Sequence, residues 1–265
     1  MPSPEKAILL AAFGSRLPGA EASLEILRLR TKERYPDFRV ETALTSGTVR
    51  RHKGVASRQS RSPEDILKGL AREGVKRLAV QSLHVIPGDE FKSLERLVAG
   101  LKGADGFERI ELGRPLLGNA DDVALVARTL LSVLPEHRQG GEAVLLMGHG
   151  TRGRANLVYL DLADELRVLD PCVLIGALEA EPGLAAKVDE LRELGVAKVH
   201  LMPLLFARGV HATRDMAGEG GGSWRTGLTA AGFACEAHVR GAGEHPELAE
   251  IWLDHLREAV EKLFA

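Results

Sequence analysis

The chain of 265 residues has little of what marks secreted, membrane or nucleic-acid-binding proteins. Its two cysteines, Cys172 and Cys235, lie in apolar runs without zinc or disulfide spacing, so we expect small core residues. No run reaches the ~18 apolar residues of a membrane span, and the first residues lack the apolar segment of a signal peptide. The net charge of −2 does not favour nucleic-acid binding. We therefore expect a cytoplasmic protein that binds neither nucleic acid nor membrane.

Strand-like and helix-like runs alternate along the chain, which is typical of parallel sheets with helical crossovers. Strands are expected at 7–13, 39–45, 76–86, 107–113, 143–148, 172–178, 197–206 and 234–239. Helices are expected at 20–34, 63–73, 91–102, 119–134, 155–169 and 184–194, with a last helix from Pro246 to Phe264. The length allows one large or two modest domains, and the hydrophobic content of 45% is ordinary for a globular protein.

The two halves of the chain resemble each other. Two pairs of segments match without gaps, 7–15 with 143–151 and 74–78 with 195–199. The first pair places Phe13 opposite His149, and the continuation of the second places Glu90 opposite His211. Apolar strands can look alike by chance. A true repeat predicts two similar three-layer α/β domains related by a pseudo-twofold, residues 1–135 and 136–265, facing each other across a cleft.

Polar side chains follow three successive strands of the second half. His149 stands between two glycines after the run 143–148, and Glu179 and His211 follow 30 and 32 residues further on in turn. Each interval is the length of one strand-plus-helix unit, so the three residues recur at the carboxyl ends of parallel strands, where ligands bind. Alone, His149 also fits a buried structural histidine. Together, two imidazoles and a carboxylate indicate a site for a divalent metal ion.

The other histidines are less informative. His137, His245 and His255 fall in polar helical or turn contexts and are expected to be solvated. His200 and His238 lie within predicted strands, where hydrogen bonding to neighbours explains them. His84 ends a strand that faces the predicted cleft, so both substrate contact and a structural role remain open.

The sequence resembles a known family, the anaerobic CbiK-type sirohydrochlorin cobaltochelatases, which are related to the class II chelatases. The resemblance covers almost the whole chain. It is carried by Ala12-Phe13-Gly14-Ser15, Leu44-Thr45-Ser46-Gly47, the run from Gln81 to Glu90, Met147-Gly148-His149-Gly150-Thr151, Gly176-Ala177-Leu178-Glu179, His200-Leu201-Met202-Pro203-Leu204, His211-Ala212 with Asp215-Met216-Ala217, and Ser223-Trp224.

The resemblance implies a chelatase-like fold of two α/β domains and the insertion of Co²⁺ into sirohydrochlorin, with release of two pyrrole protons. It places the metal and catalytic residues at His149, Glu179 and His211. The substrate-binding wall opposite them is expected to include Phe13, Ser15, His84 and Glu90. The sequence departs from the family pattern at Val210, where an aspartate is common, and at Glu181, where an aromatic residue is common.

The metal and the activity leave alternatives. Fe²⁺ insertion to make sirohaem is one, because an N₂O donor set separates Co²⁺ from Fe²⁺ poorly. A non-catalytic carrier of tetrapyrrole or metal is another. No organic cofactor is expected, and a homo-oligomer is compatible with the sequence.

One stretch of the near-neutral chain is clearly basic. The loop from Ser46 to Ser62 contains Arg50, Arg51, His52, Lys53, Arg58 and Arg61 and no acidic residue. Loops of this length inside a compact α/β unit are often functional. The family substrate carries several carboxylates, so residues 50–61 are a hypothetical steering loop beside the site, with an ordinary solvated surface loop as the alternative.

Overall fold

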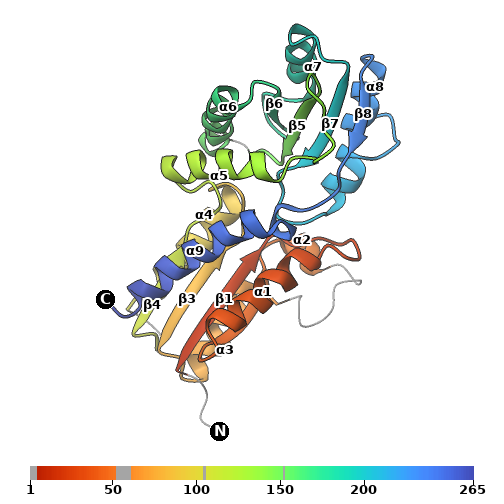
Figure 1. Cartoon of the computed structure of the whole chain (residues 1–265). Coiled ribbons are helices and arrows are strands. Elements are labelled where there is room, and N and C mark those ends of the chain that lie inside the picture. Colours follow the sequence, from red (N-terminus) through yellow and green to blue (C-terminus); the bar gives the residue numbers. More distant parts are fainter. Residues whose placement is uncertain (1–4, 52–60, 104–105, 152) are drawn as a thin grey trace. The chain divides into compact units, whose positions relative to one another are not determined.

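The computed structural model describes residues 5–51, 61–103, 106–151 and 153–265. They form two compact units, Met1–Leu116 together with Ala249–Ala265, and Leu117–Leu248. Each unit contains one four-stranded parallel sheet with helices packed against it (Figure 1). The α/β fold with two parallel sheets is therefore confirmed.

The first unit has the strand order β2-β1-β3-β4. Its strands are β1 (Lys6–Ala12), β2 (Arg39–Leu44), β3 (Arg77–Ser82) and β4 (Arg109–Gly113). Its helices are α1 (Ala22–Arg34), α2 (Gly47–Arg50), α3 (Pro63–Arg72), α4 (Asp89–Leu101) and α9 (Pro246–Lys262), whose first residues precede the unit boundary.

The second unit repeats this order as β6-β5-β7-β8. Its strands are β5 (Ala143–Gly148), β6 (Val173–Ala177), β7 (Lys198–Pro203) and β8 (Ala234–Ala237). Its helices are α5 (Ala120–Ser132), α6 (Val158–Leu169), α7 (Leu184–Glu193) and α8 (Trp224–Ala230). It also has the short 3₁₀ helices η1 (Arg154–Leu157) and η3 (Ala242–Glu244) and the π-helix η2 (His211–Met216).

The central strands explain the apolar runs of the sequence. On β1, Ile8, Leu9 and Leu10 are fully buried although their side chains alternate between the two faces of the sheet. Leu145 and Leu146 on β5 are buried in the same way. Parallel strands covered by helices on both faces read as continuous hydrophobic segments. Because the strands themselves are buried on both faces, polar side chains are found mainly after the strands end.

The backbone repeats in detail between the units. Gly14, after β1, has a φ of 91°, and Gly150, after β5, has a φ of 83°. Both angles lie in the region that glycine adopts without strain. The amide of Leu83 donates to the carbonyl of Ala11 at 2.8 Å, and the matching pair, Leu204 and Met147, is bonded at 2.9 Å. The sequence match between the halves therefore reflects a repeated fold.

The division into units differs from the boundary expected at residue 135. Residues 117–135 group with the second unit, where α5 packs against α6. The last helix groups with the first unit from residue 249 onward. There Trp252 Nε1 donates to the carbonyl of His84 at 3.2 Å, and Arg114 Nη2 bonds Glu258 Oε1 at 3.1 Å. These tertiary contacts place the last helix in the first unit, although it follows the second unit in the sequence.

Several expected environments also change. His245 and His255, expected in solvent, are buried with exposed fractions of 8% and 2%. Cys172 and Cys235 are free thiols at the margin of the core rather than inside it. Burial raises the pKa of the Cys235 thiol to about 11.

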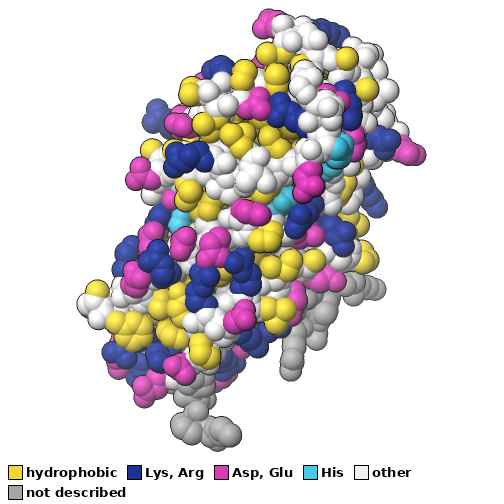
Figure 2. Space-filling model, in the orientation of Figure 1, with side chains coloured by type: hydrophobic (Ala, Val, Ile, Leu, Met, Phe, Trp, Pro, Cys, Tyr) yellow, Lys and Arg dark blue, Asp and Glu magenta, His cyan; other side chains and the backbone are white. Residues whose placement is uncertain are grey.

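The surface is mixed in charge. On the face shown in Figure 2, Lys and Arg side chains alternate with Asp and Glu side chains instead of gathering by sign. Among the residues that the structure describes, no helix combines the length and apolar character needed to cross a membrane.

Candidate metal centre

His149 is held at the end of β5 by its two glycine neighbours. A Cβ at Gly148 would lie 2.5 Å from Cζ of Tyr159, so only glycine lets the tyrosine ring pack there. Gly150 combines its positive φ with close packing, since a Cβ would lie 3.1 Å from the amide nitrogen of Ala180. The Gly-His-Gly sequence thus produces a tight turn that presents the imidazole at the strand end.

Tyr159 supports this turn from beneath. Burial raises the pKa of its hydroxyl, and hydrogen bonding to the backbone of Gly150 and His149 only partly opposes that shift. The tyrosine therefore stays neutral at all physiological pH values, and its role is to position the loop.

Glu179 and His211 reach the same place from the neighbouring strands. Glu179 follows β6, and its amide donates to the carbonyl of His149 at 2.9 Å, which ties the two strand-end loops together. His211 follows β7 and is the first residue of the π-helix η2. Such helices occur frequently at functional sites. The structure therefore brings together the three residues that sequence spacing selected.

The two imidazoles face each other. His149 Nε2 lies 3.2 Å from His211 Nε2, and the ring planes are 84° apart. The Nδ1 atom of His149 donates to the carbonyl of Gly150 at 3.0 Å, and Nδ1 of His211 donates to Asp215 Oδ2 at 2.7 Å. Because carbonyl and carboxylate oxygens only accept, both neutral rings carry their proton on Nδ1. Each Nε2 then presents a lone pair to the other.

Two opposed lone pairs repel unless a cation lies between them. Two nitrogen ligands that bind one tetrahedral ion at ~2.0–2.1 Å are about 3.3 Å apart. The observed 3.2 Å matches this separation. An outer hydrogen bond from the second ring nitrogen is the usual way in which proteins orient metal-binding histidines.

Glu179 adds an exposed carboxylate beside the pair. Its Oε2 lies 3.9 Å from Nδ1 of His149, and each of the three residues offers one ligand atom within 4.8 Å of the others. The side chains of His149 and Glu179 are 34% and 58% exposed. A metal ion held here would keep open coordination positions and could be delivered to a second molecule.

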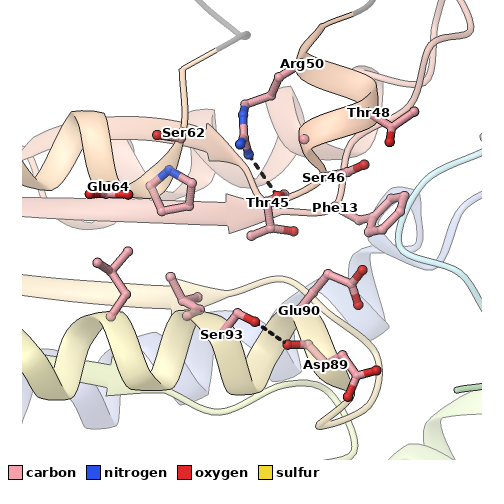
Figure 3. A pocket seen from close by; sticks show the side chains of 14 residues that line it. Phe13, Thr45, Ser46, Thr48, Arg50, Ser62, Glu64, Asp89, Glu90 and Ser93 are labelled. Atoms are coloured by element: carbon pink, nitrogen blue, oxygen red, sulfur yellow. Dashed lines mark hydrogen bonds between the residues drawn. The ribbon is translucent and has the colours of Figure 1, made fainter. Parts of the chain in front are cut away.

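The first unit has a pocket of about 580 Å³ at the corresponding strand ends. Phe13 and Glu90 line it together with Thr45, Ser46 and Arg50. In Figure 3, Phe13, Thr45 and Ser46 border one side and Glu90, from α4, the other.

This pocket occupies the place that the metal triad has in the second unit. The amide of Ser46 donates to the carbonyl of Phe13 at 3.3 Å, as the amide of Glu179 does to His149. Glu90 is the second residue of α4, and His211 starts the corresponding η2. The positions of His149, Glu179 and His211 are thus taken in the first unit by Phe13, Ser46 and Glu90, respectively. Only one of these three, Glu90, carries a carboxylate, so the first unit offers a much poorer set of metal ligands.

Ser15 and His84 do not line this pocket. Ser15 Oγ accepts from the amide of Leu17 at 3.2 Å within its own turn. His84 lies between Ser82 Oγ, 2.9 Å from its Nδ1, and Thr45 Oγ1, 3.1 Å from its Nε2. Burial lowers the pKa of His84 to about 4, so the ring is neutral at pH 7. These contacts give His84 a supporting position behind the pocket residue Thr45.

Only the ends of the basic loop can be described. Residues 52–60, with His52, Lys53 and Arg58, lie outside the described residues. Arg50 Nη1 donates to the backbone carbonyls of Leu44 and Thr45, at 2.5 and 2.8 Å. Its guanidinium therefore fastens α2 to the end of β2 and forms part of the pocket wall.

Two relationships were not predicted from the sequence. One is the pairing of His211 with Asp215, which the sequence analysis named only as part of the family pattern; the spacing of four residues on a helical turn was its signal. The other is a second group of possible metal ligands, His137, His200, Glu236 and His238. Its signal was the period of two between Glu236 and His238, which places both on one face of a strand.

Comparison with known proteins identifies the family of the chain. Residues 6–261 match the model of the family described as cobalt chelatase (CbiK). The chain is 41% identical to sirohydrochlorin cobaltochelatase CbiKC of Nitratidesulfovibrio vulgaris over 263 residues, covering 99% of this chain and 93% of the relative. It is 33% identical to sirohydrochlorin cobaltochelatase of Salmonella typhimurium over 261 residues, covering 97% of each.

Solved structures share the fold at low sequence identity. SirB from Bacillus subtilis with Fe³⁺ has a TM-score of 0.63 and 17% identity, with 96% of this chain and 95% of that chain covered. The sirohydrochlorin chelatase SirB from Bacillus subtilis subspecies spizizenii in complex with cobalt has a TM-score of 0.61 and 16% identity, with 97% and 96% covered. By its match along nearly the full length, the chain belongs to the cobalt chelatase (CbiK) family.

Proposed function

We propose that this protein inserts Co²⁺ into sirohydrochlorin, with His149, Glu179 and His211 as the residues that hold the metal. The observation that carries the proposal is the pair of Nε2 atoms 3.2 Å apart, each aimed by a hydrogen bond at its Nδ1. The two relatives compared above are named for this activity. The reaction belongs to anaerobic cobalamin biosynthesis.

The reaction requires transfer of a metal ion from the protein to the macrocycle and removal of two protons from the macrocycle. Co²⁺ replaces the protons of two pyrrole nitrogens, so the macrocycle gains the ion and releases 2 H⁺. His149 and His211 hold Co²⁺ as neutral imidazoles, and Glu179 offsets its positive charge. When the ion passes to the macrocycle, each Nε2 regains its lone pair and can accept a proton. Asp215, bonded to His211 Nδ1, stabilises the imidazolium that this transfer forms.

The first unit's pocket supplies a site for part of the macrocycle. Phe13 offers an aromatic surface for a flat conjugated ring, and Arg50 and Thr45 offer donors for its carboxylates. Glu90 provides a carboxylate that can take up a pyrrole proton. Ser15 and His84 act by supporting the loops that carry these residues.

A spectroscopic turnover assay tests the proposal. Purified protein is mixed with excess sirohydrochlorin and either Co²⁺ or Fe²⁺, and the change in the macrocycle's absorption is followed. Many turnovers with Co²⁺ are expected. Conversion limited to one equivalent per chain identifies a carrier instead, and faster conversion with Fe²⁺ identifies a sirohaem-forming enzyme. His211→Ala serves as the matched inactive control.

A further inference from the structure

A second group of metal-binding side chains lies in the second unit, outside the triad. His200, on β7, is fully buried, and Glu236, on β8, is its direct partner in the parallel register. His238 follows two residues later and so lies on the same face. His137 comes from the segment after α5. Three elements far apart in the sequence thus converge at the β7–β8 edge of the sheet.

The four side chains are already in contact. His200 Nδ1 lies 3.0 Å from His238 Nε2, and His137 Nε2 lies 2.9 Å from Glu236 Oε1. The ring centroids of the three histidines are 5.3 to 5.7 Å apart. One ligand atom from each of the four residues lies within 4.8 Å of all the others. A tetrahedral site holds its ligand atoms at ~2.0–2.3 Å from the ion, so the four donors must draw closer together to bind one. His137 is exposed and Glu236 is partly exposed, which leaves both side chains room to rotate.

A fifth residue orients the buried histidine. Glu142 Oε2 accepts a hydrogen bond from His200 Nε2 at 2.8 Å. That bond places the proton of the neutral ring on Nε2 and leaves a lone pair on Nδ1, directed at His238. A carboxylate behind a histidine is the arrangement that proteins use to raise the basicity of zinc ligands.

The charges around the cluster fit a bound cation. Lys198 Nζ lies 3.1 Å from Glu236 and 3.5 Å from Glu142, and it is the positive partner of both carboxylates. With neutral histidines, two carboxylates and one ammonium leave a net charge of −1.

We infer that His137, His200, Glu236 and His238 form a second metal site, which binds Zn²⁺ or a similar late first-row divalent ion with three nitrogens and one oxygen. Four protein ligands close the coordination sphere, which is typical of a structural site, whereas the triad has only three. A bound ion would fasten the segment after α5 and β7 to β8, an edge strand of only four residues.

The experiment measures Zn²⁺ binding with the triad removed. The full chain carrying His149→Ala and His211→Ala is stripped with a chelator, and Zn²⁺ is added alone while heat release and thermal unfolding are followed. The double variant should bind about one Zn²⁺ per chain with a rise in Tm. Adding His238→Gln or the exposed His137→Gln should abolish that binding. Adding Glu142→Gln should weaken it about 10- to 100-fold.

Two controls distinguish the loss of a Zn²⁺ ligand from a general effect of substitution and from an effect on Co²⁺ insertion. Glu193→Gln removes an exposed carboxylate of α7 and should leave Zn²⁺ binding unchanged. In the chain with an intact triad, His137→Gln should leave Co²⁺ insertion within about twofold. The inference is overturned if the double variant binds no Zn²⁺ or if Zn²⁺ binding persists undiminished in His137→Gln and His238→Gln. Since Zn²⁺ binding is measured without the triad, failure here leaves the proposed insertion of Co²⁺ intact.

Discussion

His149 Nε2 and His211 Nε2 lie 3.2 Å apart, at the ends of two adjacent strands. Neither nitrogen can donate to the other while Gly150 and Asp215 hold the Nδ1 protons. The pair is thus arranged to share a cation.

Removing a triad side chain should abolish activity without unfolding the protein. His211→Ala and Glu179→Ala truncate side chains at strand exits that contribute little to the core. We expect kcat/KM for Co²⁺ insertion to fall more than about 100-fold, since even an outer partner of a metal ligand typically matters 10- to 100-fold. Circular dichroism should be unchanged. Near-normal turnover in both variants would disprove the assignment of the ligands.

Asp215 should matter through His211. Asp215→Asn keeps the size of the side chain but removes the charge that fixes the Nδ1 proton of His211. We expect Co²⁺ binding by the protein to weaken about 10- to 100-fold. Asp189→Asn, on α7, removes an exposed carboxylate and is the matched control. Equal affinities of the two variants would exclude a positioning role.

Gly148 should tolerate no side chain. In Gly148→Ala the new Cβ would lie 2.5 Å from Cζ of the buried Tyr159, and overpacking of this kind costs about 1–3 kcal/mol of unfolding free energy. Gly140→Ala is the control, because a Cβ there meets no atom within 4 Å. Urea denaturation measures both. A stability equal to that of Gly140→Ala would mean that the tyrosine ring moves aside freely.

The stability of the protein should fall on mild acidification. Burial lowers the pKa of His84 to about 4, whereas an unfolded histidine titrates near 6.5. The unfolded chain therefore binds the proton more readily, so the stabilising difference is complete above pH ~6.5 and is lost as pH falls toward 4. The loss of unfolding free energy that His84 causes on acidification is about 3 kcal/mol at most. His245, with a pKa lowered to about 4 by burial, acts in the same direction.

The variant His84→Gln isolates the contribution of His84. Its unfolding free energy, measured in urea between pH 7 and pH 4, should depend less steeply on pH than that of the natural protein. The carboxylate of Glu142, whose pKa is lowered from 4.5 to about 2, begins to lose its stabilising effect near pH 4.5 and loses most of it below this window, so it contributes only at the acidic end. An unchanged slope in His84→Gln would contradict the burial of a neutral ring.

Arg50 and Arg51 should behave differently. The guanidinium of Arg50 binds the carbonyls of Leu44 and Thr45, so Arg50→Gln should lower stability by about 1–3 kcal/mol. Arg51 is exposed, and Arg51→Gln should raise KM for the anionic macrocycle with little change in kcat if this end of the loop steers substrate. Added salt should then lower kcat/KM of the natural protein. A KM that depends on neither Arg51 nor salt would assign the residue to solvent.

The strands, the long helices and the spacing of the triad could be predicted from the sequence. Apolar runs such as Ala143–Gly148 must be buried wherever the chain folds, and parallel strands joined by helices place His149 and Glu179 at the same end of a sheet. The repeat between the halves could be predicted as well. Gly14 and Gly150 are matched positions of the two halves, and both have a backbone conformation that favours glycine.

Which distant groups meet depends on how the elements pack in the fold. The last helix joins the first unit through Trp252 and Glu258, and no local pattern encodes that choice. His137 reaches Glu236 across 99 residues of sequence. Local periodicity reports which face of an element is apolar, whereas polar contacts between elements depend on strand order and packing. For that reason the triad could be proposed from the sequence, whereas the meeting of His137 with His200, Glu236 and His238 could be recognised only in the fold.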